Sequence, residues 1–427
     1  MMLQIFGDVG KTVYLYNRKL IRKQNKIMKS LRTFVSIVLT LLPWCVRGQQ
    51  VPVMETGANH MPDAWIDRDT GHKVIKLTRR AGDNTSFYFH NNPFIGNEML
   101  FAGSSGYGTR DSQMFAVDLS TLRIRQVTKE PYPVRTEIAC AATHEIFFQH
   151  GDSVFAVNTD NGIRRCITRL EAKSGHGAIN CVNCDGTLLA GVFSTAEEEQ
   201  LFRDHPNRHE WFNMLTDHPY ERTLFTIDTR TGRVNRFYSE VAWLNHLQFS
   251  PCDPHLLMFC HEGQWQRVDR IWNIDVTKPK ARLMHRRTME NEIAGHEWFG
   301  ALGRHIYFDL QKPRSENFFI GRVDLGTGAE QDFRISRDEW SVHFTTSWDE
   351  RFIVGDGGSP TSVAHSDKNQ WIFRFDYDGD RMKTTKLVNM KHHDYALEPN
   401  VHFSPDGKWI IFRANFEGHT DVYAVEL

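Results

Sequence analysis

One pattern of hydrophobic and polar positions recurs along the chain. Usually two hydrophobic residues are followed by a spacer, another hydrophobic residue and an acidic residue or Asn. Its seven copies end at Asp118, Asn158, Asp228, Asp275, Asp324, Asp376 and Glu426, in steps of 40, 70, 47, 49, 52 and 50 residues. Short alternating segments of this kind predict β-strands. A repeat of this period is typical of a propeller blade of four strands. The sequence therefore predicts an all-β fold, a seven-bladed β-propeller.

A second phrase opens most of the repeats. A polar residue stands three places before an aromatic or apolar residue, and a turn rich in Pro, Asp and Gly follows. The clearest copies are Asn400-Val-His-Phe403-Ser-Pro-Asp-Gly407 and His246-Leu-Gln-Phe249-Ser-Pro-Cys-Asp253, and others begin at Asn91, His296 and His343. These turn residues are those that hairpins require. The phrase therefore predicts the first strand of each blade.

The two ends of the repeat array suggest how the ring closes. The last copy reaches Leu427 without a fourth strand, and Lys73-Val-Ile-Lys-Leu-Thr78 resembles the strand that is missing. We expect this N-terminal strand to pair in the seventh blade, because closure removes exposed sheet edges. The propeller is predicted to span residues 49–427. The 70-residue step contains an insertion, residues 195–220, which we expect to form a lid or rim loop.

The first 48 residues follow a different pattern. Lys29 and Arg32 follow Met28, an apolar run extends from residue 34 to residue 46, and Gly48 ends the segment. This is the order of a secretory signal, and the run is shorter than a comfortable membrane span. Residues 1–48 are therefore interpreted as an over-called start plus a signal peptide. We expect an exported, periplasmic protein with no stable membrane span after cleavage, and an uncleaved anchor would give the same exported outcome.

Charge and cysteine content exclude some functions. The formal net charge is −1 and there is no long basic stripe, so no nucleic-acid partner is expected. An anionic ligand would need a local positive site. Cys181-Val-Asn-Cys184 has zinc-like spacing but no second pair. Buried free thiols or one or two local disulfides are the favoured interpretation of the cysteines.

Three histidines carry the candidate chemistry. His246, His296 and His343 stand at the same position in three successive repeats, and Asn91 and Asn400 occupy that position in the first and last repeats. The first strand of each propeller blade lines the channel, so these residues should converge. Three unrelated histidines in a chain that contains 21 are the alternative. A histidine cluster suits a metal site or proton transfer near neutral pH.

Other residues extend this candidate site. Glu398 could supply an oxygen ligand, and with His296 and Asn400 it would suit a hard or borderline cation. Arg222 follows the insertion and could clamp a carboxylate bidentately, or could be a solvated surface residue. His261 and Tyr395 are further candidates at strand ends.

The sequence resembles the oligogalacturonate lyases, seven-bladed propeller polysaccharide lyases, over about residues 65–427. The most specific stretches are Trp243-Leu-Asn-His246, Phe259-Cys-His-Glu-Gly263, His296-Glu, Val354-Gly-Asp-Gly357 and Phe403-Ser-Pro-Asp-Gly407. The resemblance implies β-elimination on uronides with a divalent cation, which is manganese in the type enzymes. The cation expected for this chain is Mn²⁺ or Ca²⁺. The resemblance also implies that His246 is the catalytic histidine and that His296 is the first metal ligand.

Several family positions differ in this chain. The family's His-Pro-His reads Glu398-Pro399-Asn400, its Gln ligand aligns near Tyr395, and its catalytic-site Arg lies within one residue of Arg222. A related reaction, cleavage of terminal rhamnose from glucuronic acid, requires a similar arrangement of catalytic groups. The substrate expected is therefore an acidic oligosaccharide or glycan of the oligogalacturonate or rhamnosyl-glucuronate type.

The predicted mechanism uses these residues consistently. A base of suitable pKa removes the C5 proton of the uronic acid, and His246 is the candidate. The sugar carboxylate must be neutralised, by the metal or by Arg222. The acid that protonates the leaving O4 oxygen is His343, Tyr395 or water, and Asn91 and His261 are candidate substrate-binding residues.

Two other classes of protein compete with this interpretation. A non-catalytic periplasmic glycan-binding or scaffold propeller is the alternative that the replaced ligands favour. A serine peptidase is excluded, because the chain has neither a G-x-S-x-G elbow nor residues for a hydrolase domain.

Overall fold

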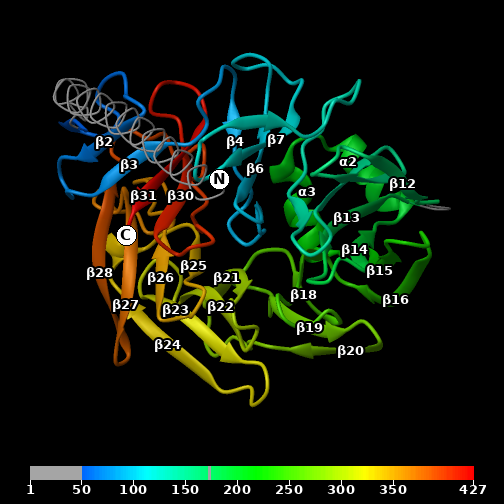
Figure 1. Ribbon diagram of the computed structural model, residues 1–427. Helices are drawn as coiled ribbons and strands as arrows, with labels where there is room; N and C mark the ends of the chain where they lie inside the picture. The colour runs from blue at the N-terminus through cyan, green and yellow to red at the C-terminus, as the bar shows by residue number, and fades with distance from the viewer. Residues whose placement is uncertain (1–50, 172–174) are drawn as a thin grey trace, which may run out of the picture. The chain divides into compact units, whose positions relative to one another are not determined.

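Antiparallel sheets, mostly of four strands, follow one another along the chain and surround a common centre (Figure 1). The computed structural model describes residues 51–171 and 175–427. The sheets belong to the compact unit Val53–Leu427. The predicted over-called start and signal peptide lie outside the described residues. No helix in the described part of the chain is both long and apolar enough to cross a membrane.

Each of the first six blades is a consecutive piece of chain. Blade one contains β4 (Asn84–Thr85), β5 (Phe94–Ile95), β6 (Glu98–Gly103), β7 (Gln113–Asp118) and β8 (Ile124–Gln126). Blade two contains β9 (Ile138–Cys140), β10 (Glu145–His150), β11 (Ser153–Asn158) and β12 (Arg164–Arg169). Blade three contains β13 (Gly177–Val182), β14 (Leu188–Phe193), β15 (Glu221–Asp228) and β16 (Val234–Val241).

Blades four to six continue this order. Blade four contains β17 (Leu244–Phe249), β18 (Leu256–His261), β19 (Ile271–Asp275) and β20 (Lys278–Leu283). Blade five contains β21 (Ile293–Phe299), β22 (His305–Gln311), β23 (Phe318–Asp324) and β24 (Glu330–Ile335), and a short 3₁₀ turn, Arg337–Glu339, follows it. Blade six contains β25 (Phe344–Thr346), β26 (Phe352–Gly355), β27 (Trp371–Asp378) and β28 (Arg381–Asn389).

The seventh blade combines the two ends of the propeller. It contains β29 (His402–Phe403), β30 (Trp409–Ala414) and β31 (Asp421–Glu426), followed in the sheet by β3 (Lys73–Lys76), β2 (Ala64–Asp67) and β1 (Val53–Met54). β3 pairs antiparallel with β31, with Val74 opposite Val425. The seven-bladed fold and its closure by an N-terminal strand are confirmed. Every copy of the repeated phrase forms the third strand of its blade.

The hydrophobic core lies between neighbouring sheets. Trp298 of blade five stacks on Tyr307 at 5.4 Å and on Phe344 of blade six at 6.3 Å between ring centroids. All three side chains are at least 97% buried. Each large buried side chain of this kind contributes about 1.5–3 kcal/mol. Side chains of alternate strand positions therefore hold each blade to the next and fix the channel between them.

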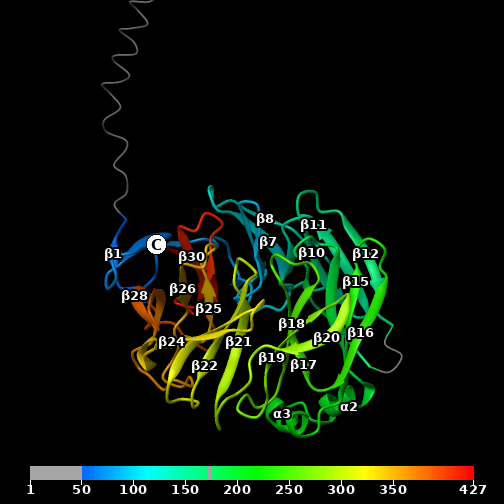
Figure 2. The same cartoon turned by 90° about the horizontal axis from the view of Figure 1, so that it is seen from below.

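The insertion between β14 and β15 is helical, whereas the sequence led us to expect a loop. It forms α2 (Ala196–Asp204) and α3 (Arg208–Asp217), which lie together at one end of the strands (Figure 2). The Thr195 side chain caps α2 by accepting from the Glu198 amide, and three glutamates fill the first turn. Phe212 of α3 packs on Trp243 at 5.2 Å between ring centroids. The helices are therefore fixed to blade four beside the channel.

The cysteines of the described residues are all free thiols. Cys181 is buried, and burial raises the pKa of its thiol to about 12. Its predicted zinc-spacing partner, Cys184, is exposed. No cluster of three metal-binding side chains in residues 51–171 and 175–427 includes either thiol.

Candidate active site

Three of the five equivalent polar positions share one unusual backbone conformation, and Asn91 and His343 do not adopt it. His246 and His296 have φ of 46° and Asn400 has φ of 52°. At the first two positions the pairing register of the strand shifts, between Asn245 and Gln248 and between Gly295 and Trp298. A bulge of this kind re-aims a side chain, and His and Asn tolerate left-handed φ better than bulky residues. At these three positions, the shared place in the sequence repeat therefore corresponds to one repeated backbone conformation.

The structure brings the three predicted histidines together. The rings of His296 and His343 lie 4.7 Å apart between centroids. Burial lowers the pKa of His296 well below its ordinary value, and the charges of His343, Arg270 and His246 lower it further. His296 is therefore neutral near pH 7. Its neighbours include one cationic side chain, Arg270, and the two other predicted histidines.

His246 is held by a buried carboxylate. Its Nε2 lies 3.0 Å from Oε2 of Glu262, and 36% of its side chain is exposed. Glu262 also accepts from Arg270 at 2.8 Å and from the indole of Trp265 at 3.1 Å. Burial acts to raise the pKa of Glu262, but Arg270 and His246 outweigh it and hold that pKa well below its usual range. Because Glu262 stays ionised and accepts Nε2–H, the nitrogen of His246 that can accept a proton is the other one, Nδ1.

His343 is fully enclosed by protein. Its Nδ1 lies 2.9 Å from Oδ2 of Asp356, and its Nε2 lies 3.2 Å from the Tyr88 hydroxyl and 3.8 Å from Oε2 of Glu398. The ring stacks on Phe89 at 4.7 Å. Both nitrogens of this predicted catalytic residue therefore face protein partners.

A cavity of about 630 Å³ opens beside these histidines. Three predicted site residues line it: His296, Tyr395 and Glu398. Trp265 and Phe212 add aromatic surface, and the Trp265 ring meets His296 at 5.0 Å in an edge-to-face contact. An aromatic wall with a few polar groups in a cavity of this size is typical of a small-ligand site.

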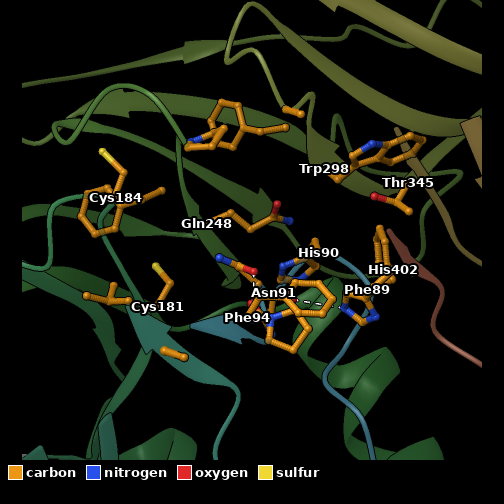
Figure 3. Close-up of a pocket in the computed structure, with 18 of the residues that line it drawn as sticks. Phe89, His90, Asn91, Phe94, Cys181, Cys184, Gln248, Trp298, Thr345 and His402 are labelled. Carbon is orange, nitrogen blue, oxygen red and sulfur yellow. Dashed lines mark hydrogen bonds between the residues drawn. The ribbon is translucent and has the colours of Figure 1, made fainter. Parts of the chain in front are cut away.

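A second cavity, of about 310 Å³, lies toward the other ends of the first strands. His90, Asn91, Gln248 and His402 surround it (Figure 3). Asn91, a predicted substrate-binding residue, thus lines a different cavity from Glu398. Its amide donates to Glu137 at 3.2 Å.

Arg222 already binds a carboxylate of the protein. Its Nε and Nη2 contact Glu198 of α2, with Nε 3.0 Å from Oε2, and its Nη1 donates to the Leu244 carbonyl at 2.8 Å. Both partners are more than 90% buried. The bidentate geometry expected for a sugar carboxylate is therefore occupied by the helical insertion.

Two further predicted residues have structural partners. The Tyr395 hydroxyl donates to the Asp356 carbonyl at 3.0 Å. His261 contacts Glu240 of β16 at 3.2 Å and stacks on Trp272 of β19 at 4.6 Å. His261 is therefore directed between blades three and four.

The three predicted metal ligands differ in whether their ligand atoms are already occupied by hydrogen bonds within the protein. Asn400 is fully buried, and its Oδ1 accepts from the Phe89 amide at 2.9 Å, so it would have to give up that bond to bind a cation. Glu398 is 45% exposed at the cavity. Nδ1 of His296 is buried and has no hydrogen-bond partner among the described residues.

Two other groups in the described part of the chain bring three ligand atoms within 4.8 Å of one another. They are His246, Cys260 and Glu262, and Glu417, His419 and Asp421. Cations of the protein already compensate both groups, since Arg270 binds Glu262 and the Lys76 ammonium lies 2.6 Å from Asp421. Neither group contains a predicted metal ligand.

Three important residues escaped the sequence analysis. Glu262 follows directly after His261, and Asp356 lies within Val354-Gly-Asp-Gly357, so both could have been found as carboxylates just beyond the second strand of a blade. Tyr88 lies in the irregular segment between β4 and β5, where no repeat signals it.

Comparison with known proteins identifies the family. A family model described as oligogalacturonate lyase matches residues 59–427. The chain belongs to the oligogalacturonate lyase family. The resemblance detected in the sequence is confirmed, and so is the prediction of a carbon–oxygen lyase that acts by β-elimination to give an unsaturated uronide. The alternative of a non-catalytic propeller loses its support.

Individual members of the oligogalacturonate lyase family align over most of the chain. The oligogalacturonide lyase of Pectobacterium atrosepticum and the oligogalacturonate lyase of Dickeya dadantii are each 24% identical over 393 residues, 85% of this chain and 95% of theirs. A solved oligogalacturonate lyase in complex with manganese superimposes with a TM-score of 0.72 at 22% identity, over 86% of this chain and 96% of that one. The enzyme from Vibrio parahaemolyticus gives 0.72 at 20% identity, over 85% and 96%. These structural likenesses support the fold.

Proposed function

We propose that this lyase cleaves an acidic oligosaccharide at a uronic acid residue, of the oligogalacturonate or rhamnosyl-glucuronate type, with His246 as the base. The observation that carries the proposal is the partly exposed imidazole held at Nε2 by the ionised, buried Glu262. Such an arrangement leaves Nδ1 to accept a proton, and the negative charge stabilises the imidazolium that forms. The homologues named for oligogalacturonate support the first substrate type.

The reaction follows from this arrangement. His246 takes the C5 proton, the electron pair of the C5–H bond forms the C4–C5 double bond, and the C4–O4 bond breaks with its electrons on O4. The leaving O4 then takes a proton from an acid. The aromatic surface of Trp265 and Phe212 would bind a sugar ring and exclude water beside the base.

We further propose that His296 and Glu398 hold a divalent cation. The buried, unpartnered Nδ1 of His296 and the exposed carboxylate of Glu398 on the same cavity wall support this set, and a solved relative contains manganese. When bound, the cation neutralises the uronate carboxylate and makes the C5 proton more acidic. Asn400 is a poorer ligand, because its oxygen already accepts a hydrogen bond.

The direct test is the ultraviolet absorbance of the unsaturated uronide. Residues 49–427 would be assayed on oligogalacturonates and on rhamnosyl-glucuronate glycans. His246→Ala should abolish turnover with little change in thermal stability. The matched control is His255→Ala, an exposed histidine in a turn of the same blade. Loss of folding in His246→Ala, or full turnover by it, would contradict the proposal.

A chelator tests the cation separately. Chelation should lower turnover, Mn²⁺ or Ca²⁺ should restore it, and His296→Ala should lose the restoration. An enzyme that is fully active in chelator would refute the metal role and transfer the neutralisation of the carboxylate to a cationic side chain.

A further inference from the structure

Arg314 places a positive charge at the wall of the larger cavity. It is the one lysine or arginine among the described residues that line this cavity. It lies in the turn between β22 and β23, where its side chain is exposed. In the described part of the chain, its guanidinium forms neither an ion pair nor a hydrogen bond. The protein itself therefore does not compensate this charge.

The other arginines near the candidate site already bind carboxylates of the protein. Arg222 is held by Glu198 of the helical insertion. Arg270 lies 2.8 Å from Glu262. Both arginines are more than 90% buried, and removing one partner of a buried ion pair is strongly unfavourable. Arg314 is therefore the guanidinium that can meet a carboxylate of the substrate.

The other charges on the cavity wall explain why a cation is needed there. Glu398 is 45% exposed on this wall. Asp309 adds a second carboxyl group, which accepts from Trp340 and from Gln311 at 3.0 Å each. An oligosaccharide of uronic acids brings a further negative charge with each residue, so like charges oppose its entry. Arg314 supplies the local positive charge that such a ligand requires.

Hydrogen bonds from neighbouring segments fix the turn that carries Arg314. The Arg314 amide donates to the Asn291 carbonyl at 2.7 Å, and the Ser315 amide donates to Gln311 at 2.9 Å. Arg337 donates to the Ser315 carbonyl at 2.6 Å. Ser315 has φ of 62°, a left-handed conformation that is costly for residues other than Gly and that clusters at ligand sites. The backbone position of Arg314 is therefore fixed before a ligand binds, which lowers the entropic cost of binding.

The rest of the wall offers groups that bind sugar rings and sugar hydroxyls. Trp265 and Phe212 supply aromatic surface, and Ser359, Thr361 and Ser362 supply hydroxyl groups. The Ser359 hydroxyl lies 2.8 Å from that of Thr361 and 3.2 Å from that of Ser362. Aromatic surface, neutral hydrogen-bonding groups and one guanidinium together suit an acidic sugar chain.

We propose that Arg314 binds the carboxylate of a second uronate, next to the one that is cleaved, and so selects substrates with consecutive uronates. The guanidinium holds this carboxylate through two parallel N–H···O hydrogen bonds and takes no part in bond cleavage. Arg314 thereby favours the oligogalacturonate type over the rhamnosyl-glucuronate type, because the rhamnose that leaves carries no carboxylate. This assignment rests on the proposed function.

The test compares two trisaccharides that share a central galacturonate and its linkages. Trigalacturonate has a carboxylate on every residue, whereas its matched partner has galactose at both ends. The unsubstituted enzyme should have the lower KM on trigalacturonate. Arg314→Gln should raise that KM by about 10–100-fold with little change in kcat, because it removes a charge-assisted contact made equally in the ground state and the transition state. Its KM on the galactose-capped trisaccharide should stay the same, and Arg314→Lys, which lacks the planar fork, should lie between.

The matched control is Arg304→Gln. Arg304 is an exposed arginine at the other end of β22 and does not line this cavity, so its replacement should change neither KM. An unchanged KM of Arg314→Gln on trigalacturonate would overturn the proposal, and so would equal rises of KM on both trisaccharides.

Equilibrium binding separates this proposal from the proposed function. His246→Ala should bind trigalacturonate without cleaving it, and adding Arg314→Gln should weaken that binding by the same 10–100-fold. An unsubstituted enzyme that cleaves no uronide would refute the proposed function. An active enzyme whose affinity for trigalacturonate does not depend on Arg314 would refute this assignment alone.

Discussion

His285 gives the propeller a stability that should depend on pH. The residue lies in the connection between β20 and β21, where its Nδ1 is 2.7 Å from Glu330 and its Nε2 is 3.1 Å from Glu292. His285 and Glu292 are almost completely buried. Burial acts against the charged ring, but hydrogen bonds to both carboxylates outweigh it and raise the pKa of His285 to about 9 from 6.5.

The size and sign of the effect follow from this difference. A pKa higher by about 2.5 in the folded state corresponds to about 3 kcal/mol of unfolding free energy. Because the folded state binds the proton more tightly, this stability is fully present below pH 6.5. It is lost as the pH rises through about 9.

The measurement is urea unfolding of the wild-type protein and of His285→Gln over this pH range. Groups common to both proteins cancel in the difference between their unfolding free energies. That difference should shrink by about 3 kcal/mol from below pH 6.5 to above pH 9. Parallel curves for the two proteins would refute the reasoning, because they would mean that folding does not raise the pKa of His285.

Two further predictions concern the active site. Glu262→Gln removes the charge that orients His246 and should lower kcat by about 10²-fold or more. The measurement is the initial rate on the preferred uronide, with thermal unfolding as a control for folding. An unchanged kcat would contradict the role of Glu262. Glu198→Gln leaves the buried Arg222 without its carboxylate and should destabilise the protein by about 3–5 kcal/mol in urea unfolding, with faster proteolysis within residues 195–220. Unaltered stability would mean that the pair does not hold the helical insertion.

The repeat architecture could be predicted because its signals are local. Alternating strands and turn residues act within each repeat, so the copies of the phrase ending at Asp118 and Glu426 mark third strands in the first and last blades. The shared phase of His246, His296 and Asn400 is equally local, since one backbone conformation recurs at all three positions.

The partners of the site residues could not be predicted in the same way. Arg222 meets Glu198 from an insertion that no other blade contains, and Asn400 meets the backbone of Phe89 across the closed ring. Blade one breaks the repeat, because an irregular segment separates β4 from β5. That irregularity moves Asn91 to the second cavity and places Tyr88 beside His343.

The closure of the ring also sets the order in which the enzyme can be assembled. Thr78 bonds Asp421, a partner 343 residues later in the chain. During synthesis, a chain that has not yet reached β31 therefore presents β3 and the last completed blade as unpaired edges. Blades four to six, which supply His246, His296 and His343, can already stand side by side at that stage. Tyr88 and Asn400 meet their partners when the two chain ends come together, so the lyase acquires its full set of groups at the last step of folding.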